Sequence, residues 1–315
     1  MPATPLRILV VGAGATGGYY GGRLLQAGRD VTFLVRPARA ALLRASGLQI
    51  VSPHGDATLH PPLVTADTIG APFDVVLLSV KGYALDRAID DLAPAVGPAT
   101  LIVPMLNGLR HIDRLAERFG EQAVLGGVSH IAVTVDDAGR IVQMNEMQKL
   151  AYGVRRAGGA IEPARLGALH ALLSDAGFDA RLSEAIDRDM WEKWIFLATL
   201  GGITCLMRGT IGAIEAVPGG AALARHLLSE CAAIASACGE APGAEFLAQT
   251  ERTVTAPGSG LASSMYRDLQ RGLDVEVEQI LGDLLTRAEG AGVAAPVLTA
   301  ACVHLRVYRQ GIASA

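Results

Sequence analysis

The pattern of hydrophobic and polar positions divides the chain into two parts of different character. In the first part, short apolar runs typical of buried strands alternate with stretches of helical periodicity. The strand-like runs span residues 6–11, 31–35, 74–80, 100–105, 123–135, 141–145 and 150–154, and the helical ones span 19–26, 84–92, 110–119 and 163–176. This alternation is typical of βαβ units, so it predicts an α/β fold with a doubly wound parallel sheet.

Helical periodicity alone continues through the second part. The predicted helices span residues 187–207, 219–238, 243–254, 263–289 and 296–309, with no strand-like run between them. The change of pattern predicts an α/β domain over residues 1–184 and an all-helical domain over residues 185–315. A chain of 315 residues, half of them hydrophobic, is long enough to build a core in each domain.

A glycine-rich turn directly follows the first predicted strand and precedes the first predicted helix. It consists of Gly12-Ala13-Gly14-Ala15-Thr16-Gly17. In a G-x-G-x-x-G turn, the first glycine permits the tight turn, the second lets the backbone approach a pyrophosphate, and the third lets helix and strand pack closely. The free N–H groups of the helix N-terminus then favour an anion. The context predicts a Rossmann-like dinucleotide site, and the alternative is a purely structural glycine turn.

Charged residues around the second predicted strand bear on the choice of dinucleotide. NAD-binding domains usually place an acidic residue at the end of this strand, on the ribose 2′-hydroxyl. Asp30 precedes the strand and is therefore at the wrong end, whereas Arg36 directly follows it. A guanidinium there suits a 2′-phosphate, which favours NADP(H) with Arg36 as the first candidate. Arg39 and Arg44 come next, and their alternative role is a solvated helix face.

Two further polar residues follow predicted strands. Lys81 comes after the strand that ends at residue 80, and Asn107 after the strand that ends at residue 105. Ligands of open parallel sheets bind outside the carboxyl ends of the strands, so both residues are candidates for the cofactor site. The alternatives are a surface lysine and a turn asparagine, because Asn-Gly is a common turn dipeptide.

The helical domain offers candidates for acid–base chemistry. Reduction of a carbonyl by a nicotinamide needs a proton donor besides the hydride. Lys193, between two tryptophans on an apolar helix, is the first candidate, and its alternative role is an ion pair with Asp189 four residues earlier. Glu276 and Glu278 lie in a predicted helix, where a solvated acidic face is the usual alternative.

Composition narrows the classes of partner and location. A net charge of −4 and 4% aromatic residues argue against binding to nucleic acid or an anionic membrane. The four cysteines form no C-x-x-C pair, and the seven histidines show no metal-ligand spacing, which predicts buried reduced thiols and no metal. The longest apolar stretch, residues 194–207, is too short for a membrane span and predicts a buried helix. We expect a cytoplasmic protein.

Several of these motifs together resemble the ketopantoate reductase (2-dehydropantoate 2-reductase) family. The likeness runs over residues 6–309 and covers both predicted domains. The motifs that carry it, in chain order, are the turn Gly12–Gly17, Leu-Leu-Ser-Val-Lys81, Asn107-Gly108, Trp191-Glu-Lys193, Ser263-Ser-Met-Tyr-Arg-Asp268 with Val275-Glu276, and Gly292–Pro296.

The resemblance implies the NADPH-dependent reduction of 2-dehydropantoate to pantoate, a step in pantothenate biosynthesis. It implies that Lys193 is the general acid and contacts the substrate, and that Glu276 holds the cofactor or orients the lysine. Asn107 would contact cofactor and substrate, and Ser264 would bind the substrate carboxylate. Lys81 and the backbone of Ala132 are further implied cofactor contacts. They join the contacts predicted above from the residues themselves, which are Gly12, Ala13, Gly14, Ala15, Thr16, Gly17 and Arg36.

The chain departs from the family pattern at its substrate amides. The family's helix carries asparagines four and eight residues after its lysine and a further one beyond the helix; here Leu197, Gly201 and, by a looser alignment, Ile211 stand there. Ala84 stands in place of a family glutamine. Because Leu197 and Gly201 share a helix face with Lys193, their pocket loses hydrogen bonds that can supply ~10⁴-fold discrimination between substrates.

Three functions therefore stay open. The first is ketopantoate reduction with other groups in place of the missing amides. The second is reduction of a different, more apolar 2-oxo acid or ketone, and the third is an NADP(H)-binding sensor without catalysis. The expected partner is a small 2-oxo acid, and the helical domain is a candidate surface for a homodimer, although no interface pattern marks it.

Overall fold

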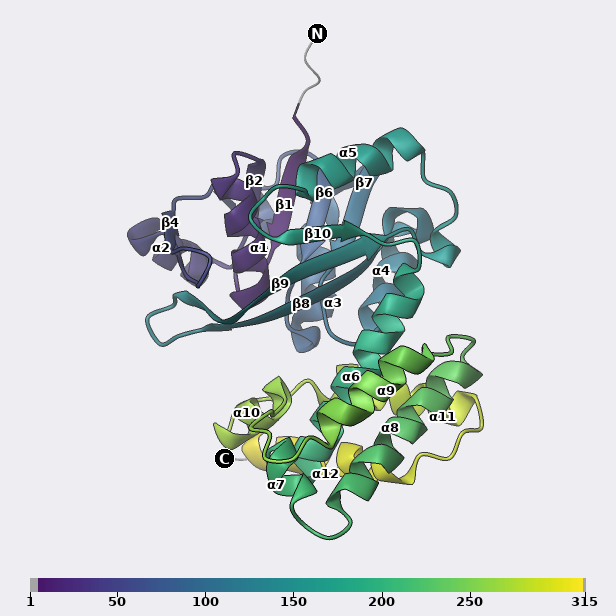
Figure 1. Ribbon diagram of the computed structural model, residues 1–315. Coiled ribbons are helices and arrows are strands. Elements are labelled where there is room, and N and C mark those ends of the chain that lie inside the picture. The colour runs from purple at the N-terminus through teal and green to yellow at the C-terminus, as the bar shows by residue number, and fades with distance from the viewer. Residues whose placement is uncertain (1–4, 314–315) are drawn as a thin grey trace. The chain divides into compact units, whose positions relative to one another are not determined.

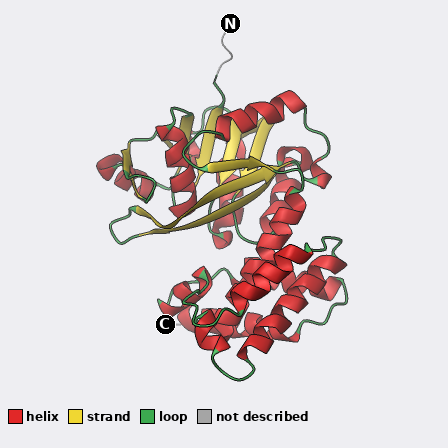
Figure 2. Cartoon of the chain, viewed as in Figure 1, coloured by secondary structure: helices red, strands yellow, loops and turns green. Residues whose placement is uncertain are grey.

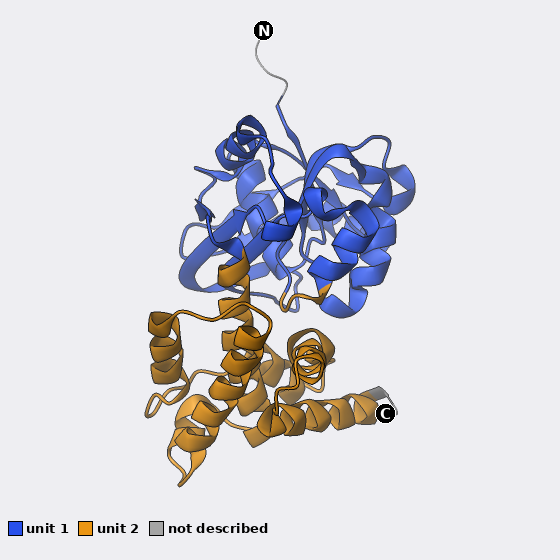
Figure 3. Cartoon of the chain, turned by 90° about the vertical axis from the view of Figure 1, so that its right-hand side faces the viewer, with its two compact units in different colours: residues 1–106, 111–186 blue, residues 107–110, 187–315 orange. Residues whose placement is uncertain are grey.

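The computed structural model describes residues 5–313, and within them every strand precedes the long helices of the second half. Figure 1 follows this order along the chain, and Figure 2 separates strands from helices by colour. The chain forms two compact units, one of Met1–Leu106 and His111–Ile186 and the other of Asn107–Arg110 and Asp187–Ala315 (Figure 3). The predicted fold class, a parallel α/β sheet followed by an all-helical region, is confirmed.

Five parallel strands form the central sheet of the first unit, in the order β5-β2-β1-β6-β7. Their bounds are β1 Arg7–Val11, β2 Asp30–Leu34, β5 Leu63–Val64, β6 Phe73–Leu78 and β7 Val96–Pro104. The middle strand β1 is apolar on both faces, and Ile8, Leu9 and Val10 are fully buried. The turn that follows β1 therefore lies at the middle of the carboxyl edge of the sheet, where open α/β sheets bind ligands.

Helices cover both faces of this sheet. The bounds are α1 Ala15–Gln26, α2 Pro37–Ser46, α3 Leu85–Leu92 and α4 Arg110–Phe119. The connection through α1 runs from β1 to β2, and the one through α3 runs in the opposite direction across the sheet, from β6 to β7. Because parallel crossovers are right-handed, α1 and α3 lie on opposite faces of the sheet.

A second sheet packs on the outer side of α1. It has the order β10-β9-β3-β4, and β8 pairs antiparallel with β9. The bounds are β3 Leu48–Val51, β4 Ala57–Leu59, β8 Gly126–Val135, β9 Ile141–Gly153 and β10 Asp179–Leu182, with α5 Pro163–Leu173 between the last two strands. Gly18 and Gly22 permit the close approach, since side chains there would overlap Ile141 and Ile50.

The second sheet contains the main errors of the strand prediction. The runs 141–145 and 150–154 are parts of one strand, β9. The strands β3, β4, β5 and β10 were not predicted, because each has only two to four residues and most of their positions are partly exposed. Such short strands are stabilised by their neighbours rather than by a local apolar run.

The regular elements of the second unit are all helical within its described residues. Its helices are α6 Ile186–Met207, α7 Ile211–Glu215, α8 Gly220–Ala237, α9 Ala244–Val254, α10 Ser264–Gln270, α11 Asp283–Gly290 and α12 Pro296–Ala313, with a π-helical turn at Glu278–Gly282. As predicted, α6 is a largely buried helix, with Trp194, Ile195 and Ala198 almost fully covered. Of the residues described, no helix is long and apolar enough to span a bilayer.

The prediction of one helix over residues 263–289 is wrong. The helix ends at Gln270, and an irregular segment carries the chain to residue 276. Gly272 has φ +70°, a conformation that other residues adopt only with strain, and it explains where the helix stops. The correction matters because Glu276 lies in the irregular segment and is 6% exposed rather than on a solvated helical face.

The cysteine prediction is only partly correct. Cys205, Cys231 and Cys302 are buried thiols, whereas Cys238 ends α8 and is exposed. Within residues 5–313, no group of three His, Cys, Asp or Glu side chains could hold a metal ion.

Candidate active site

The glycine turn has the geometry that a dinucleotide phosphate needs. Gly12 has φ +97°, which favours glycine, and a side chain at Gly17 would overlap the Ser79 hydroxyl and the Gly12 carbonyl. In contrast, a Cβ at Gly14 would meet no atom within 4 Å. The turn is therefore tight at its first glycine, closely packed at its third, and open at its second, where the backbone would face a pyrophosphate.

The N-terminus of α1 supplies donors for that anion. Gly14 is the N-cap and has no side chain that could cap the helix. The first bond within the helix runs from the Gly18 amide to the Gly14 carbonyl, 2.9 Å. The amides of Ala15, Thr16 and Gly17 precede this bond and lack intrahelical acceptors, so these residues fit a bound diphosphate.

Ser79 holds the turn in place and was missed by the sequence analysis. It follows β6, which ends at Leu78 and not at residue 80 as expected. Its hydroxyl donates to the Gly12 carbonyl at 3.1 Å, and it also lies 3.3 Å from the Val11 carbonyl. The sequence signal for Ser79 was a small hydroxyl residue at the carboxyl end of a predicted strand.

The structure places Arg36 and Arg39, the first two basic residues after β2, in different surroundings. Arg36 is the exposed N-cap of α2, two residues beyond the strand. Arg39 does not lie on a solvated helix face: its Nε donates to the Ala13 carbonyl at 3.1 Å, and its Nη1 and Nη2 lie 3.3 and 3.4 Å from the Gly139 carbonyl. Burial lowers the pKa of Arg39. Arg44 is exposed. Arg39 therefore supports the turn, whereas Arg36, at the N-terminus of α2, is the accessible guanidinium next to β2.

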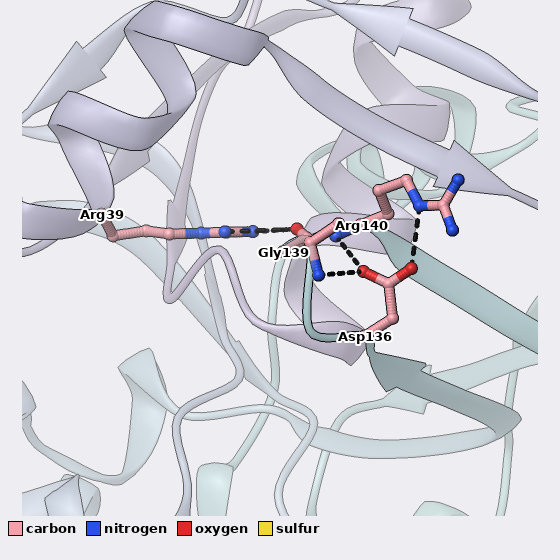
Figure 4. A network of polar contacts seen from close by, with 5 residues as sticks. Arg39, Asp136, Gly139 and Arg140 are labelled. Atoms are coloured by element: carbon pink, nitrogen blue, oxygen red, sulfur yellow. Dashed lines mark hydrogen bonds and ion pairs between the residues drawn. The ribbon is translucent and has the colours of Figure 1, made fainter.

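The contact at Gly139 joins the glycine turn to the β8–β9 hairpin. Figure 4 shows Arg39 pointing at the Gly139 carbonyl beside the ion pair of Asp136 with Arg140. The Asp136 carboxylate accepts from the Arg140 amide at 2.8 Å and from the Arg140 Nε at 2.8 Å. The hairpin tip is thus internally braced, and Arg39 links it to Ala13.

Two other cofactor candidates also lie in the first unit. Lys81 is exposed and precedes a short 3₁₀ turn after β6. Ala132 lies in β8 at a β-bulge, because the pairing with β9 shifts between Ile131 and Val133. Bulges interrupt ladder pairing and are common beside active sites, so the Ala132 backbone is suited to an external contact.

The second unit brings together Asn107, Lys193 and Glu276. The Asn107 Nδ2 donates to the Glu276 Oε2 at 3.4 Å, although the two residues are far apart in sequence. Lys193, on the first turns of α6, is partly exposed. Desolvation lowers the pKa of Lys193 to about 8, and Coulomb attraction from Glu276 opposes this shift. A lysine, a carboxylate and an amide therefore form one cluster, as the resemblance implied.

The π-helical turn after Glu276 packs against both neighbours of this cluster. Trp194 directly follows Lys193 in sequence, and its Nε1 donates to the Ile280 carbonyl at 2.8 Å. A side chain at Gly108, whose φ is +74°, would overlap the Gln279 carbonyl. The residues adjacent to Lys193 and Asn107 are therefore anchored on the turn that follows Glu276. π-Helical turns are frequent at functional sites.

The positions of the missing family amides are apolar. At Gly201, an added Cβ would lie 2.5 Å from the Met265 Cε, so the Met265 side chain occupies the space beside this glycine. Leu197 is partly exposed on the same face of α6 as Lys193, and Ile211 is fully buried. No polar group replaces the amides at these three positions.

Neighbouring hydroxyl groups are used in local structure. Ser263 caps α10 by accepting from the Tyr266 amide at 3.0 Å, and its hydroxyl lies 2.9 Å from that of Thr204. Thr204 also donates to the Leu200 carbonyl at 2.6 Å. Ser264 is the exposed first residue of α10 and is the more accessible of the two serines.

Comparison with known proteins identifies the family. Residues 8–156 match the family model "Ketopantoate reductase PanE/ApbA", and residues 185–309 match "Ketopantoate reductase PanE/ApbA C terminal". The chain is 34% identical to an uncharacterized oxidoreductase, YkpB, of Bacillus subtilis, covering 96% of this chain and 99% of that protein.

Two further relatives carry a stated activity. The chain is 30% identical to the 2-dehydropantoate 2-reductase of Mesorhizobium japonicum over 88% of this chain and 89% of the relative. It is also similar to the crystal structure of the 2-dehydropantoate 2-reductase of Geobacter metallireducens, with a TM-score of 0.85, 29% identity, and coverage of 96% and 99%. The chain therefore belongs to the ketopantoate reductase family of oxidoreductases, which implies a 2-oxo acid substrate and a nicotinamide cofactor.

Proposed function

We propose that this protein reduces a 2-oxo acid to the 2-hydroxy acid with NADPH, and that Lys193 donates the proton. The observation that carries the proposal is the cluster of Lys193, Glu276 and Asn107, in which the lysine has a pKa of about 8. Reduction adds a hydride to the carbonyl carbon and a proton to its oxygen; the cofactor supplies the hydride when bound.

The environment of Lys193 suits this role. A general acid works best when its pKa is near the working pH, because it is then still protonated but gives up the proton readily. An exposed lysine with a pKa near 10.5 would hold its proton too tightly, and desolvation corrects this. Glu276 keeps the ammonium form populated by Coulomb attraction, and Asn107 donates to the same carboxylate.

The cofactor assignment combines the glycine turn with Arg36. Gly12, Gly14 and Gly17, with the amides of Ala15 and Thr16, would hold the diphosphate. Arg36 would pair with the 2′-phosphate that distinguishes NADPH from NADH. Lys81, Asn107, Glu276 and the Ala132 backbone are the further proposed cofactor contacts, and Ser264 with Asn107 and Lys193 the proposed substrate contacts.

Ketopantoate is the first candidate for the substrate. Its support is the 30% identical relative named 2-dehydropantoate 2-reductase and the retention of Lys193, Glu276, Asn107 and Ser264. The product would be pantoate, the hydroxy acid used in pantothenate biosynthesis.

A second candidate is a 2-oxo acid or ketone with a more apolar side chain. The observation in its favour is the contact of Met265 with Gly201, together with Leu197 on the same helix face. These groups offer no hydrogen bond to a substrate hydroxyl, so a polar substrate would lose binding energy relative to an apolar one.

Lys193→Ala tests the acid role. Turnover with a 2-oxo acid and NADPH should fall at least ~100-fold, the scale of general acid catalysis, while NADPH affinity changes little. Lys149→Ala is the matched control, because that lysine is 64% exposed and lies 3.9 Å from Asp179 in the second sheet. Equal turnover in the two variants would contradict the proposal.

A pair of substrates separates the two candidates. Ketopantoate and 3,3-dimethyl-2-oxobutanoate differ only in the 4-hydroxyl, so the ratio of their kcat/KM values isolates recognition of that group. A clear preference for ketopantoate supports the first candidate. A preference for the analogue supports the apolar pocket and leaves the acid role of Lys193 intact.

A further inference from the structure

Glu276 lies in a segment held from outside by the last helix. The segment Leu273–Glu278 follows Gly272 and leads from α10 into the first residue of the π-helical turn. Its two flanking carboxylates, Asp274 and Glu278, stay partly exposed, whereas Glu276 between them is buried. The position of the Glu276 carboxylate therefore depends on what holds the two residues on either side of it.

Helix α12 holds both flanking carboxylates with forked ion pairs. The Arg306 Nε and Nη2 donate to the two carboxylate oxygens of Glu278 at 2.9 and 2.7 Å. The Arg309 Nε and Nη2 donate to the two oxygens of Asp274 at 2.7 and 3.3 Å. The arginines are three residues apart, so they project from one helix face, and forked pairs fix direction as well as distance.

Two further contacts belong to the same arrangement. The Tyr308 hydroxyl donates to the Leu273 carbonyl at 2.8 Å, so α12 also holds the start of the segment. Gly282 leaves space for the ion pair, because a Cβ there would overlap the Glu278 carboxylate and lie 3.2 Å from the Arg306 Nη2. The hydrogen bond with Arg306 lowers the pKa of Glu278, which keeps this carboxylate charged.

The buried side of the segment carries Glu276, the residue that interacts with Asn107 and Lys193. Val275 and Val277 are buried, at 2% and 0% exposure, and Glu276 between them contacts Asn107 and acts on Lys193. The other charged groups that act on the pair Glu278–Arg306 are Arg110, Arg309 and Glu289, and Cys302 is a further titratable neighbour. Glu276 is the charged group that raises the pKa of Lys193.

We propose that the pairs Asp274–Arg309 and Glu278–Arg306 form an ionic clamp that fixes Glu276 against Asn107 and Lys193, which makes Arg306 and Arg309 positioning residues. The inference rests on the proposed role of Lys193 and Glu276. Exposed ion pairs generally contribute little to stability. If these two pairs did not position Glu276, their removal would leave catalysis unchanged.

The experiment compares Arg306→Gln/Arg309→Gln with the parent enzyme in kcat, in KM and in the pH dependence of kcat/KM. We expect kcat to fall about tenfold, since displacement of a catalytic group by ~1 Å can cost up to ~100-fold. We also expect the alkaline limb of kcat/KM to move to lower pH, because a displaced Glu276 attracts the Lys193 ammonium less. The melting temperature should change little.

Two sets of variants make the result specific. Arg225→Gln removes another exposed pair of the same unit, with Glu251 at 2.8 Å, and should leave both the rate and the pH limb in place. The charge swap Asp274→Arg/Arg309→Asp should recover part of the loss seen in Arg309→Asp alone. If the double variant folds poorly, Arg306→Lys and Arg309→Lys keep the charges but lose the fork, and they should give smaller shifts in the same direction.

The outcomes separate the clamp from the proposed function. A clamp variant that matches Arg225→Gln in kcat and pH limb overturns the clamp. If Glu276→Gln moves the limb and the clamp variants do not, only the clamp fails. If neither Lys193→Ala nor Glu276→Gln alters the reaction, the proposed function fails as well.

Discussion

The pH dependence of the reduction should follow the protonation of Lys193. With a pKa of about 8, the lysine is about 90% protonated at pH 7 and about 10% at pH 9. Only the protonated form can donate, so kcat/KM for the reduction should be flat below pH 7 and fall tenfold per pH unit well above 8. Oxidation of the 2-hydroxy acid needs the neutral amine and should rise over the same range.

The variant Glu276→Gln turns this profile into a test of the cluster. Glu276 raises the pKa of Lys193 by Coulomb attraction, while desolvation lowers it. Removing the carboxylate charge leaves desolvation unopposed, so the alkaline limb should move below pH 8. The glutamine keeps the size of the side chain and can still contact Asn107, which limits other changes.

The assay is the initial rate of NADPH oxidation, followed by ultraviolet absorbance, over a pH series at constant ionic strength. The limb should be read from kcat/KM, which reports the free enzyme, because bound substrate changes the surroundings of the lysine. A limb near 10.5, the ordinary lysine value, would refute the desolvation argument. A limb that moves upward in Glu276→Gln would refute the Coulomb argument.

The other predictions concern the cofactor turn and stability. Arg36→Ala should weaken NADPH binding roughly 10–100-fold, the loss of a charged hydrogen bond, and NADH much less; equal losses in fluorescence titrations would remove Arg36 from the 2′-phosphate. Gly14→Ala should keep the melting temperature but weaken cofactor binding, whereas Gly17→Ala should lower the melting temperature, because only the second overlaps Ser79. Lys193→Met should raise the free energy of unfolding at pH 7 by at most about 3 kcal/mol, from a shift of 10.5 to about 8. That gain should shrink between pH 8 and 10.5. Urea unfolding of the variant and the parent protein at about pH 7 and near pH 10 would check it.

The parts of the fold that could be predicted are those with a strong local signal. The strands β1 and β6 each contain a run of four apolar residues, and the glycine turn lies between a strand and a helix, so these features were recognised from the sequence. In contrast, β5 has two residues and depends on pairing with β2. No local pattern marks such a strand.

The site was predictable in its residue types but not in its contacts. Lys193 and Glu276 were chosen as candidates, yet Glu276 was placed on a helix, because the break at Gly272 was overlooked. Arg39 was a further candidate for the 2′-phosphate, with a solvated helix face as its alternative role. Its contacts with Ala13 and with Gly139, which lies in a hairpin 100 residues later, were not anticipated. The space beside Gly201 is likewise filled by Met265 from another helix. These contacts are set by tertiary packing, which single-sequence patterns do not contain.

The π-helical turn after Glu276 has a consequence for how this region can change in evolution. A turn of this kind holds one residue more than an α-helical turn, and each residue advances a helix by about 100°. Deletion of a single residue within Glu278–Gly282 would restore an ordinary helix and rotate the preceding chain by that angle. Glu276 would then face away from Lys193 although every side chain of the proposed site was still present. We therefore expect the loss of one residue here to disrupt the proposed chemistry more than a conservative substitution of one site residue.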